Sequence, residues 1–215
     1  MRPMANTEKR GPTLFYRFAR VLVIIFTALF YPTRLINGEH ADIAEPFILI
    51  CNHQSMMDPV MLAAKLRQHE IHFIGKRELT KFKPLKWVVE RLHMVAVSRK
   101  ASDLAAMRAA TAVVREGHVL GIFPEGTRCH GVPMATIESG TSMIALRTRV
   151  PLLPVYITPR PRFFRRHLMV VGPPIPYDDL AKETVDKSVS DALNRRIQDT
   201  YLALANKYNK KTSVA

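Results

Sequence analysis

A histidine and an aspartate stand five positions apart in the segment NHQSMMD, residues 52–58. On one continuous helix this spacing corresponds to about 500°, so the side chains of His53 and Asp58 would point to different faces. They can meet where a strand turns into a helix, with His53 in the turn and Asp58 at the start of the helix. The aspartate would then accept a hydrogen bond from one imidazole nitrogen and leave the other free to take up a proton, as in the basic half of a hydrolase triad.

A protein nucleophile for this pair is not evident in the sequence. Ser55 is too close along the chain, and the segment 140–144 lacks the last glycine of a G-x-S-x-G nucleophile elbow. The pair therefore indicates that a hydroxyl of the substrate attacks instead. The alternative interpretation is a structural loop histidine and an aspartate that caps the next helix, in which Pro59 takes the first position.

Two further segments carry groups suited to anions. FPEGTR (123–128) combines a strand-ending proline, a glycine that allows close backbone approach and an arginine whose planar fork suits phosphate or carboxylate. It is not a phosphate-binding P-loop, because Thr127 stands where that motif requires lysine. GKREL (75–79) is followed by more lysines and by Trp87, a combination suited to an anionic interface. Each segment can also be an ordinary solvated turn or basic loop.

Short apolar runs alternate with helical stretches along most of the chain. The runs predicted to be strands are 46–51, 71–75, 94–97, 118–123, 152–157 and 168–171. The stretches predicted to be helices are 59–67, 102–116, 137–147 and 190–208. This alternation predicts an α/β fold in which helices flank a central, mostly parallel sheet. In such sheets ligands bind beyond the carboxyl ends of strands, which is where NHQSMMD and FPEGTR stand.

The first 40 residues are predicted to form a membrane-associated helical segment that precedes one α/β domain over residues 41–215. Residues 21–31 are apolar, and a helix extended back to residue 14 takes in two arginines. A spanning helix needs about 20 apolar residues, and a cleaved signal peptide needs a small-residue site that the sequence after residue 31 does not offer. We favour a helix over residues 14–31 that lies in the headgroup layer; a spanning, a cleaved and a core helix stay open as alternatives.

The charge of the chain is strongly unbalanced. Its 215 residues include 32 Lys+Arg against 18 Asp+Glu, a formal net charge of +14. The excess lies in residues 1–20, 76–100 and 147–167, which indicates anionic partners: a membrane surface, a phosphorylated substrate or nucleic acid. A hydrophobic fraction of 47% excludes wholesale disorder, and a mean hydropathy of −0.02 excludes a polytopic membrane protein. Two cysteines are too few for a disulfide scaffold or a four-cysteine zinc site.

Four segments in this order resemble the glycerolipid acyltransferases, in particular the 1-acyl-sn-glycerol-3-phosphate (lysophosphatidic acid) acyltransferases. They are NHQSMMD (52–58), GKREL (75–79), FPEGTR (123–128) and VPLLPVYI (150–157). The similarity spans roughly residues 45–175 and implies a glycerol-3-phosphate-acyltransferase-like fold for an acyltransferase domain over residues 41–215. It also implies an O-acyltransferase that moves a fatty acyl group from an acyl thioester, either acyl-CoA or acyl carrier protein, to the free hydroxyl of lysophosphatidic acid, giving phosphatidic acid.

The resemblance further implies roles for individual residues. His53 would be the general base, and Asp58 would orient and support its imidazole. The group that would bind the acceptor's phosphate comprises Lys76, Glu125, Gly126, Thr127 and Arg128. Within this group Glu125 would organise the loop, and Pro154 would shape the acyl site. No metal and no bound cofactor are implied, because a thioester is already activated.

The implied partners are a lysophospholipid acceptor, the acyl thioester and an anionic membrane surface. The chain would be monotopic on the cytoplasmic face of the membrane, held by residues 14–31. Arginines beside Phe163 and Phe164 could dock any of these anions. The motifs do not separate lysophosphatidic acid from glycerol 3-phosphate, dihydroxyacetone phosphate or another lyso-lipid, such as that of an ornithine lipid.

Outside this family, the alternatives are a nucleic-acid-binding module and a membrane scaffold with an inactive acyltransferase domain. No nucleic-acid-binding motif is found in the sequence, and aromatic residues make up only 8% of it, so we expect no nucleic-acid partner. The intact pair of His53 and Asp58 argues against an inactive scaffold.

Overall fold

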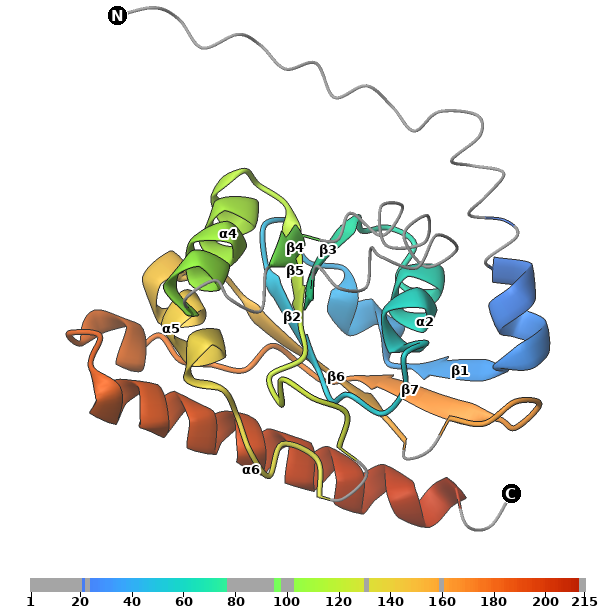
Figure 1. The fold of residues 1–215 in the computed structure, drawn as a ribbon. Coiled ribbons are helices and arrows are strands. Elements are labelled where there is room, and N and C mark those ends of the chain that lie inside the picture. The colour runs from blue at the N-terminus through green and yellow to red at the C-terminus, as the bar shows by residue number, and fades with distance from the viewer. Residues whose placement is uncertain are drawn as a thin grey trace, which may run out of the picture.

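A seven-stranded sheet forms the centre of the computed structural model (Figure 1). The residues that the structure describes are 21, 24–76, 95–97, 103–129, 132–158 and 161–212. The strands are β1 (Thr33–Ile36), β2 (Ile48–Cys51), β3 (Ile71–Lys76), β4 (Val95–Val97), β5 (Val119–Ile122), β6 (Leu152–Ile157) and β7 (His167–Val171). Six of them were predicted from their apolar runs, with ends that agree within two residues.

The strand order across the sheet is β1-β7-β6-β2-β5-β3-β4. All neighbouring pairs are parallel except β6 and β7, which are antiparallel. The predicted α/β fold with a mostly parallel sheet is therefore confirmed. Because β2, β3, β5 and β6 run the same way, the segments that follow them gather at one edge of the sheet.

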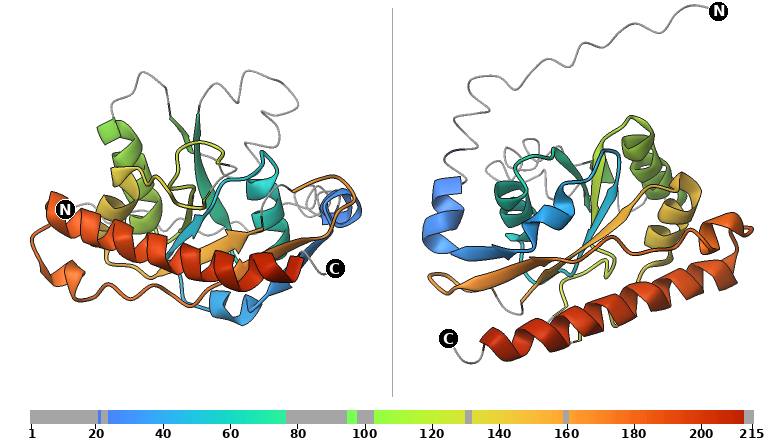
Figure 2. Two further views of the ribbon diagram at one scale, coloured as in Figure 1. Left: turned by 90° about the horizontal axis from the view of Figure 1, so that it is seen from below. Right: turned by 180° about the vertical axis from the view of Figure 1, so that it is seen from behind.

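Helices cover both faces of the sheet (Figures 1 and 2). The helix α2 (Asp58–Lys65) lies on one face, and α4 (Asp103–Arg115), α5 (Ser139–Thr148) and α6 (Lys187–Thr212) lie on the other. Two short 3₁₀ helices, η1 (Gly38–Ala41) and η3 (Leu180–Lys182), lie in connections. All four predicted helices are present, and α6 is longer than predicted at both ends.

Each face of the sheet has its own hydrophobic core. Ile48 and Ile50 of β2 pack into the core beneath α4, α5 and α6, whereas Leu49 and Cys51 pack into the core beside α2. All four side chains are fully buried. A central parallel strand covered on both faces has to be apolar throughout, which explains why β2 reads as a continuous apolar run.

The strand β1 was missed by the sequence analysis. The sequence places its residues in the N-terminal segment, whereas the structure pairs them in parallel with β7 at the edge of the sheet. Only the first of its four residues is buried, so β1 lacks the apolar run by which the other strands are recognised. An edge position explains this composition, because one side of the strand has no neighbour.

The residues that precede β1 are helical over 24–30. Most of the remainder of the predicted helix 14–31 lies outside the described residues, as do residues 1–20 and most of the basic stretch 76–100. Among the described helices, none has the length and apolar character needed to cross a membrane.

Candidate active site

The turn between β2 and α2 brings the predicted histidine and aspartate together at the carboxyl end of a central strand. Nδ1 of His53 lies 2.9 Å from Oδ2 of Asp58. The Asp58 side chain is fully buried, at 0% exposure, whereas the His53 side chain keeps 20% of its surface exposed. A strand–turn–helix junction therefore does place the two side chains in contact, as the spacing predicts.

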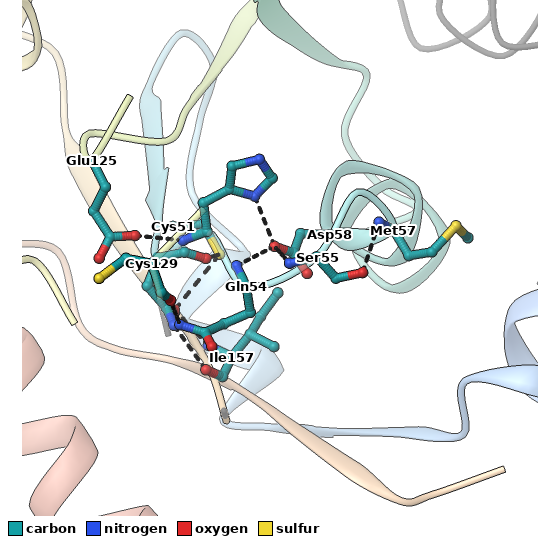
Figure 3. Close-up of polar contacts among 10 residues, drawn as sticks. Cys51, Gln54, Ser55, Met57, Asp58, Glu125, Cys129 and Ile157 are labelled. Atoms are coloured by element: carbon teal, nitrogen blue, oxygen red, sulfur yellow. Dashed lines mark hydrogen bonds and ion pairs between the residues drawn. The ribbon is translucent and has the colours of Figure 1, made fainter. Parts of the chain in front are cut away.

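The carboxylate of Asp58 accepts hydrogen bonds from the turn and does not cap the helix (Figure 3). Met57 occupies the cap position of α2, and no side chain makes a capping hydrogen bond. Oδ2 of Asp58 instead turns back to accept the backbone N–H groups of Gln54, at 2.6 Å, and Ser55, at 2.7 Å. The alternative interpretation of Asp58 as a helix cap is thus wrong, because its carboxylate oxygen receives two backbone donors and the imidazole of the preceding turn. These contacts hold the carboxylate, and with it the ring, in one orientation.

The imidazole of His53 is also held by an aromatic ring. Phe123 stacks on it with ring centroids 4.3 Å apart, and Phe73 stacks on Phe123 at 5.9 Å. Because Nδ1 faces a carboxylate, Nδ1 carries the proton of the neutral ring and Nε2 is left as the acceptor. No hydrogen bond to Nε2 is found among the described residues. This nitrogen is therefore available to take a proton from a bound molecule.

Glu125 lies buried behind the same turn, with 3% of its surface exposed. Its Oε2 accepts the backbone N–H of His53 at 2.7 Å, and its Oε1 accepts the N–H of Met134 at 2.9 Å. Burial raises the pKa of Glu125, while these two N–H donors act in the opposite direction. These two bonds tie the loop that follows β5 to the backbone of His53 and Met134.

Further contacts join the loops that follow β2, β5 and β6 (Figure 3). The backbone N–H of Cys129 donates to the carbonyl of His53 at 2.9 Å, and the amide of Gln54 donates to the carbonyl of Cys129 at 2.6 Å. The buried amide of Asn52 bonds both backbone groups of Ile157, accepting its N–H at 2.8 Å and donating to its carbonyl at 2.9 Å. The sequence analysis assigned no role to Asn52 or Gln54. The only feature of the sequence that could have pointed to them is their position inside the NHQSMMD segment.

The predicted phosphate-binding residues are only partly brought together. Gly126, Thr127 and Arg128 are exposed directly after buried Glu125. Gly126 has a φ of 64°, a conformation that favours glycine, and an added Cβ would lie 3.0 Å from Cγ of Glu138. Lys76 ends β3 at the same edge of the sheet, but its side chain and residues 77–79 lie outside what the structure describes.

Pro154 is buried in the middle of β6, in register with Ile50 of β2. Alternation along the strand puts it on the same face as Leu152 and Tyr156, which belong to the core beneath α6. Phe123, which stacks on His53, packs against the opposite core. The side chain of Pro154 therefore points away from the face on which His53 is held.

The two cysteines lie in different environments. Burial raises the pKa of the Cys51 thiol well above its usual range, so it stays protonated in the core. Cys129 is partly exposed and contributes backbone groups to the turn. Within the part of the chain that the structure describes, no three His, Cys, Asp or Glu side chains are arranged to hold a metal ion.

Comparison with known proteins gives consistent matches. The family model described as Acyltransferase matches residues 33–158. A 1-acyl-sn-glycerol-3-phosphate acyltransferase of Bacillus subtilis (strain 168) is 26% identical over 194 residues, which are 86% of this chain and 96% of that protein. A relative of the same name from Borreliella burgdorferi is 30% identical over 124 residues, 57% of this chain and 49% of that protein, so the chain spans about half of its length.

A solved structure has the same fold. The crystal structure of the 1-acyl-sn-glycerophosphate (LPA) acyltransferase PlsC from Thermotoga maritima superposes with a TM-score of 0.67 and 23% sequence identity, covering 90% of this chain and 81% of that one. At this identity the likeness concerns the fold.

Proposed function

This chain belongs to the acyltransferase family, and on that premise we propose that it transfers a fatty acyl group from an acyl thioester to the free hydroxyl of lysophosphatidic acid, giving phosphatidic acid. The observation that carries the proposal is the contact of 2.9 Å between His53 and buried Asp58, which leaves Nε2 of His53 without a protein partner among the described residues. A base of this kind, with no nucleophile of the protein beside it, suits a substrate that brings its own hydroxyl.

In the proposed reaction His53 acts twice. Nε2 takes the proton of the acceptor hydroxyl as the hydroxyl oxygen attacks the thioester carbonyl carbon. Asp58 stabilises the resulting imidazolium through the other ring nitrogen. When the carbon–sulfur bond breaks, the leaving thiolate takes the proton from the imidazolium, so the products are an ester and a free thiol. Glu125 and Asn52 keep the turn in place throughout.

The acceptor's phosphate would be bound by the exposed residues that follow Glu125. Arg128 offers a planar fork for two phosphate oxygens, and Gly126 and Thr127 offer backbone groups beside it. Lys76, at the end of a neighbouring strand, would add a second positive charge. Pro154 would shape the acyl site indirectly, through β6.

The proposal also concerns the acyl donor and the location of the chain at the membrane. Acyl-CoA and acyl carrier protein are both polyanionic thioesters and suit a chain with a net charge of +14. We propose that the chain is monotopic on the cytoplasmic face of the membrane. Residues 1–40 would form the membrane-associated segment, which also supplies β1, and residues 41–215 would form the acyltransferase domain.

The test is acyl transfer by the detergent-solubilised full chain with lysophosphatidic acid and a long-chain acyl-CoA, or with an acyl carrier protein thioester in a parallel reaction. Free thiol and phosphatidic acid are measured together. We expect both products from the wild type, and a loss of turnover of about 10³-fold in His53→Ala. The control is His118→Ala, since His118 precedes β5 at the opposite edge of the sheet.

A second variant tests the phosphate site. Arg128→Ala should raise the KM for the acceptor with a smaller change in kcat, whereas Arg147→Ala, an exposed arginine of α5, should change neither. Retained activity in His53→Ala would overturn the assignment of the base. A wild type that is inactive with both donors would overturn lysophosphatidic acid as the acceptor.

A further inference from the structure

The connection between β6 and β7 exposes two adjacent phenylalanines. Phe163 keeps 57% and Phe164 keeps 67% of its surface in solvent. We call residues 161–166 the hairpin tip, since they join the antiparallel strands β6 and β7. Two neighbouring aromatic side chains left this exposed at the tip of a hairpin are unusual for a protein surrounded only by water.

The hairpin tip is held in place by the segment that precedes β1. The backbone N–H of Phe164 donates to the carbonyl of Phe30 at 2.8 Å, and the rings of Tyr31 and Phe163 lie 4.8 Å apart. Phe30 also packs against both phenylalanines of the tip, with centroids at 6.1 and 5.4 Å. Figures 1 and 2 show the helix over 24–30 and the β6–β7 connection side by side at one end of the molecule.

The helix over 24–30 continues the apolar surface. Ile25 is 55% and Leu29 is 60% exposed, and this spacing of four residues places them on one side of the helix. The apolar surface is therefore built from two segments that lie more than 130 positions apart in the sequence. One backbone hydrogen bond and several aromatic contacts join the two segments.

Arginines flank the two phenylalanines of the tip. Arg162, Arg165 and Arg166 are all exposed, and the sequence from residue 147 to residue 167 contains no acidic residue. An apolar surface bordered by arginines is complementary to a lipid bilayer with anionic headgroups, where apolar rings enter the interface and guanidinium groups contact phosphates.

The position of this surface relative to His53 follows from the sheet. The hairpin begins at the carboxyl end of β6, and Ile157 at that end is bonded directly to Asn52, which precedes His53. The strand β1 runs antiparallel to β6, so the helix before β1 reaches the sheet at this same edge. A bilayer that contacts the tip therefore lies at the edge of the sheet where a lipid acceptor has to reach the imidazole.

We propose that the hairpin tip and the exposed side of the helix over 24–30 form one surface that docks on an anionic lipid bilayer. Its residues are Ile25, Leu29, Arg162, Phe163, Phe164, Arg165 and Arg166. This surface adds a contact contributed by the acyltransferase domain to the proposed attachment through the N-terminal segment. The inference rests on the proposed membrane location and not on the proposed reaction.

The first test measures flotation of the full chain with vesicles of phosphatidylcholine, with and without phosphatidylglycerol. The variant Phe163→Ser with Phe164→Asn should bind both kinds of vesicle at least roughly tenfold more weakly. Asparagine is chosen because Phe164 has a φ of 59°, which asparagine tolerates. The matched control is Leu104→Ser with Leu202→Ser, which removes exposed leucines from α4 and α6 and should leave flotation unchanged.

The second test concerns charge. Neutralising the three arginines in Arg162→Gln, Arg165→Gln, Arg166→Gln should weaken binding to vesicles with phosphatidylglycerol by about 100-fold, because each basic residue near such a surface contributes about 1 kcal/mol. Binding to phosphatidylcholine alone should change little. The matched control neutralises three exposed arginines of α4 and α5 and should retain binding; it is Arg108→Gln, Arg115→Gln, Arg147→Gln.

These experiments test the docking surface independently of the proposed acyl transfer. Unchanged flotation of the phenylalanine variant, or equal losses in the two arginine variants, would overturn the docking surface whatever the enzymatic result. An arginine variant that keeps vesicle binding but no longer binds an acyl carrier protein would assign the surface to the donor and overturn the proposal as well. Turnover with detergent-dispersed lysophosphatidic acid is measured in parallel and tests only the chemistry.

Discussion

The turn around His53 and the hairpin tip lie at the same edge of one sheet and are built in opposite ways. In the turn, the carboxylates of Asp58 and Glu125 are buried, at 0% and 3% exposure, and are bonded to backbone N–H groups. At the tip, Phe163 and Phe164 are more than half exposed. One region holds polar groups inside the protein, and the other holds apolar groups outside it.

The difference shows what each region requires from the fold. A buried carboxylate needs hydrogen-bond donors, and the donors that reach Oδ2 of Asp58 and both oxygens of Glu125 tie the turn together and hold His53. An exposed aromatic ring contributes little to folding, so the tip is free to serve a partner. Substitutions in the turn should therefore reduce activity or stability, whereas substitutions at the tip should alter binding and leave both largely intact.

The largest effect is expected from Asp58→Asn. The amide oxygen can take the place of Oδ2 and keep the backbone bonds of Gln54 and Ser55, but a neutral amide stabilises the His53 imidazolium poorly. We expect kcat to fall by about 10³-fold or more, with little change in melting temperature. Kinetics and thermal unfolding are measured on the same preparation. A large loss of stability with unchanged kcat would make Asp58 a purely structural residue.

A smaller effect is expected from Glu125→Gln. The new amide presents an N–H to one of the backbone donors that the carboxylate now accepts, from His53 or Met134, and leaves that donor unpaired. An unpaired buried donor costs about 1–3 kcal/mol, which denaturant unfolding would detect. The exposed Glu183→Gln is the matched control and should change the unfolding free energy little. Equal stability of the two variants would contradict the positioning role of Glu125.

At the base of the hairpin, the effect should appear as a dependence on pH. Burial lowers the pKa of His167 from its usual value of 6.5. As the pH falls below about 6.5, the unfolded chain binds a proton that the folded chain binds only at lower pH, so this histidine reduces the unfolding free energy in that window. His167→Gln should make stability depend less steeply on pH there, as measured by denaturant unfolding at several pH values. An unchanged slope would show that other groups govern this range.

The smallest effect on folding is expected from Phe163→Ser. Because the ring is 57% exposed, the unfolding free energy should change by no more than about 0.5 kcal/mol, and kcat with detergent-dispersed substrate should be unchanged. The same substitution at buried Phe73, which is 1% exposed, should cost about 3 kcal/mol or more. Similar losses of unfolding free energy at Phe163 and Phe73 would contradict the proposed difference between the exposed tip and the buried interior.

Much of the fold could be predicted because a mostly parallel sheet leaves a clear pattern. Strands such as β2 and β6 are covered on both faces and must be apolar throughout, so they stand out from the helices between them. The edge strand β1 has no such requirement and was missed. The helix α6 extends beyond its predicted limits at both ends, over Lys187–Thr212.

The sequence predicted which residues form the candidate site more completely than it predicted the hydrogen bonds between them. The types and spacing of His53 and Asp58 predicted their meeting at a turn, since only a turn allows it. The use of the carboxylate by Gln54 and Ser55 was not predicted, because those bonds involve backbone atoms whose direction depends on the turn itself. For the same reason nothing in the sequence revealed that Asn52 holds Ile157, 105 residues away.

The sequence by itself determined the alternation of strands and helices, the histidine and its acid, and the excess of positive charge, because each depends on local residue type and spacing. Only the tertiary structure decided that Glu125 holds the backbone of His53, that Pro154 points to the opposite face, and that Phe30 and Phe164 lie together. Those facts depend on which strands become neighbours, and strand order is set by the packing of the whole chain and not by any one segment.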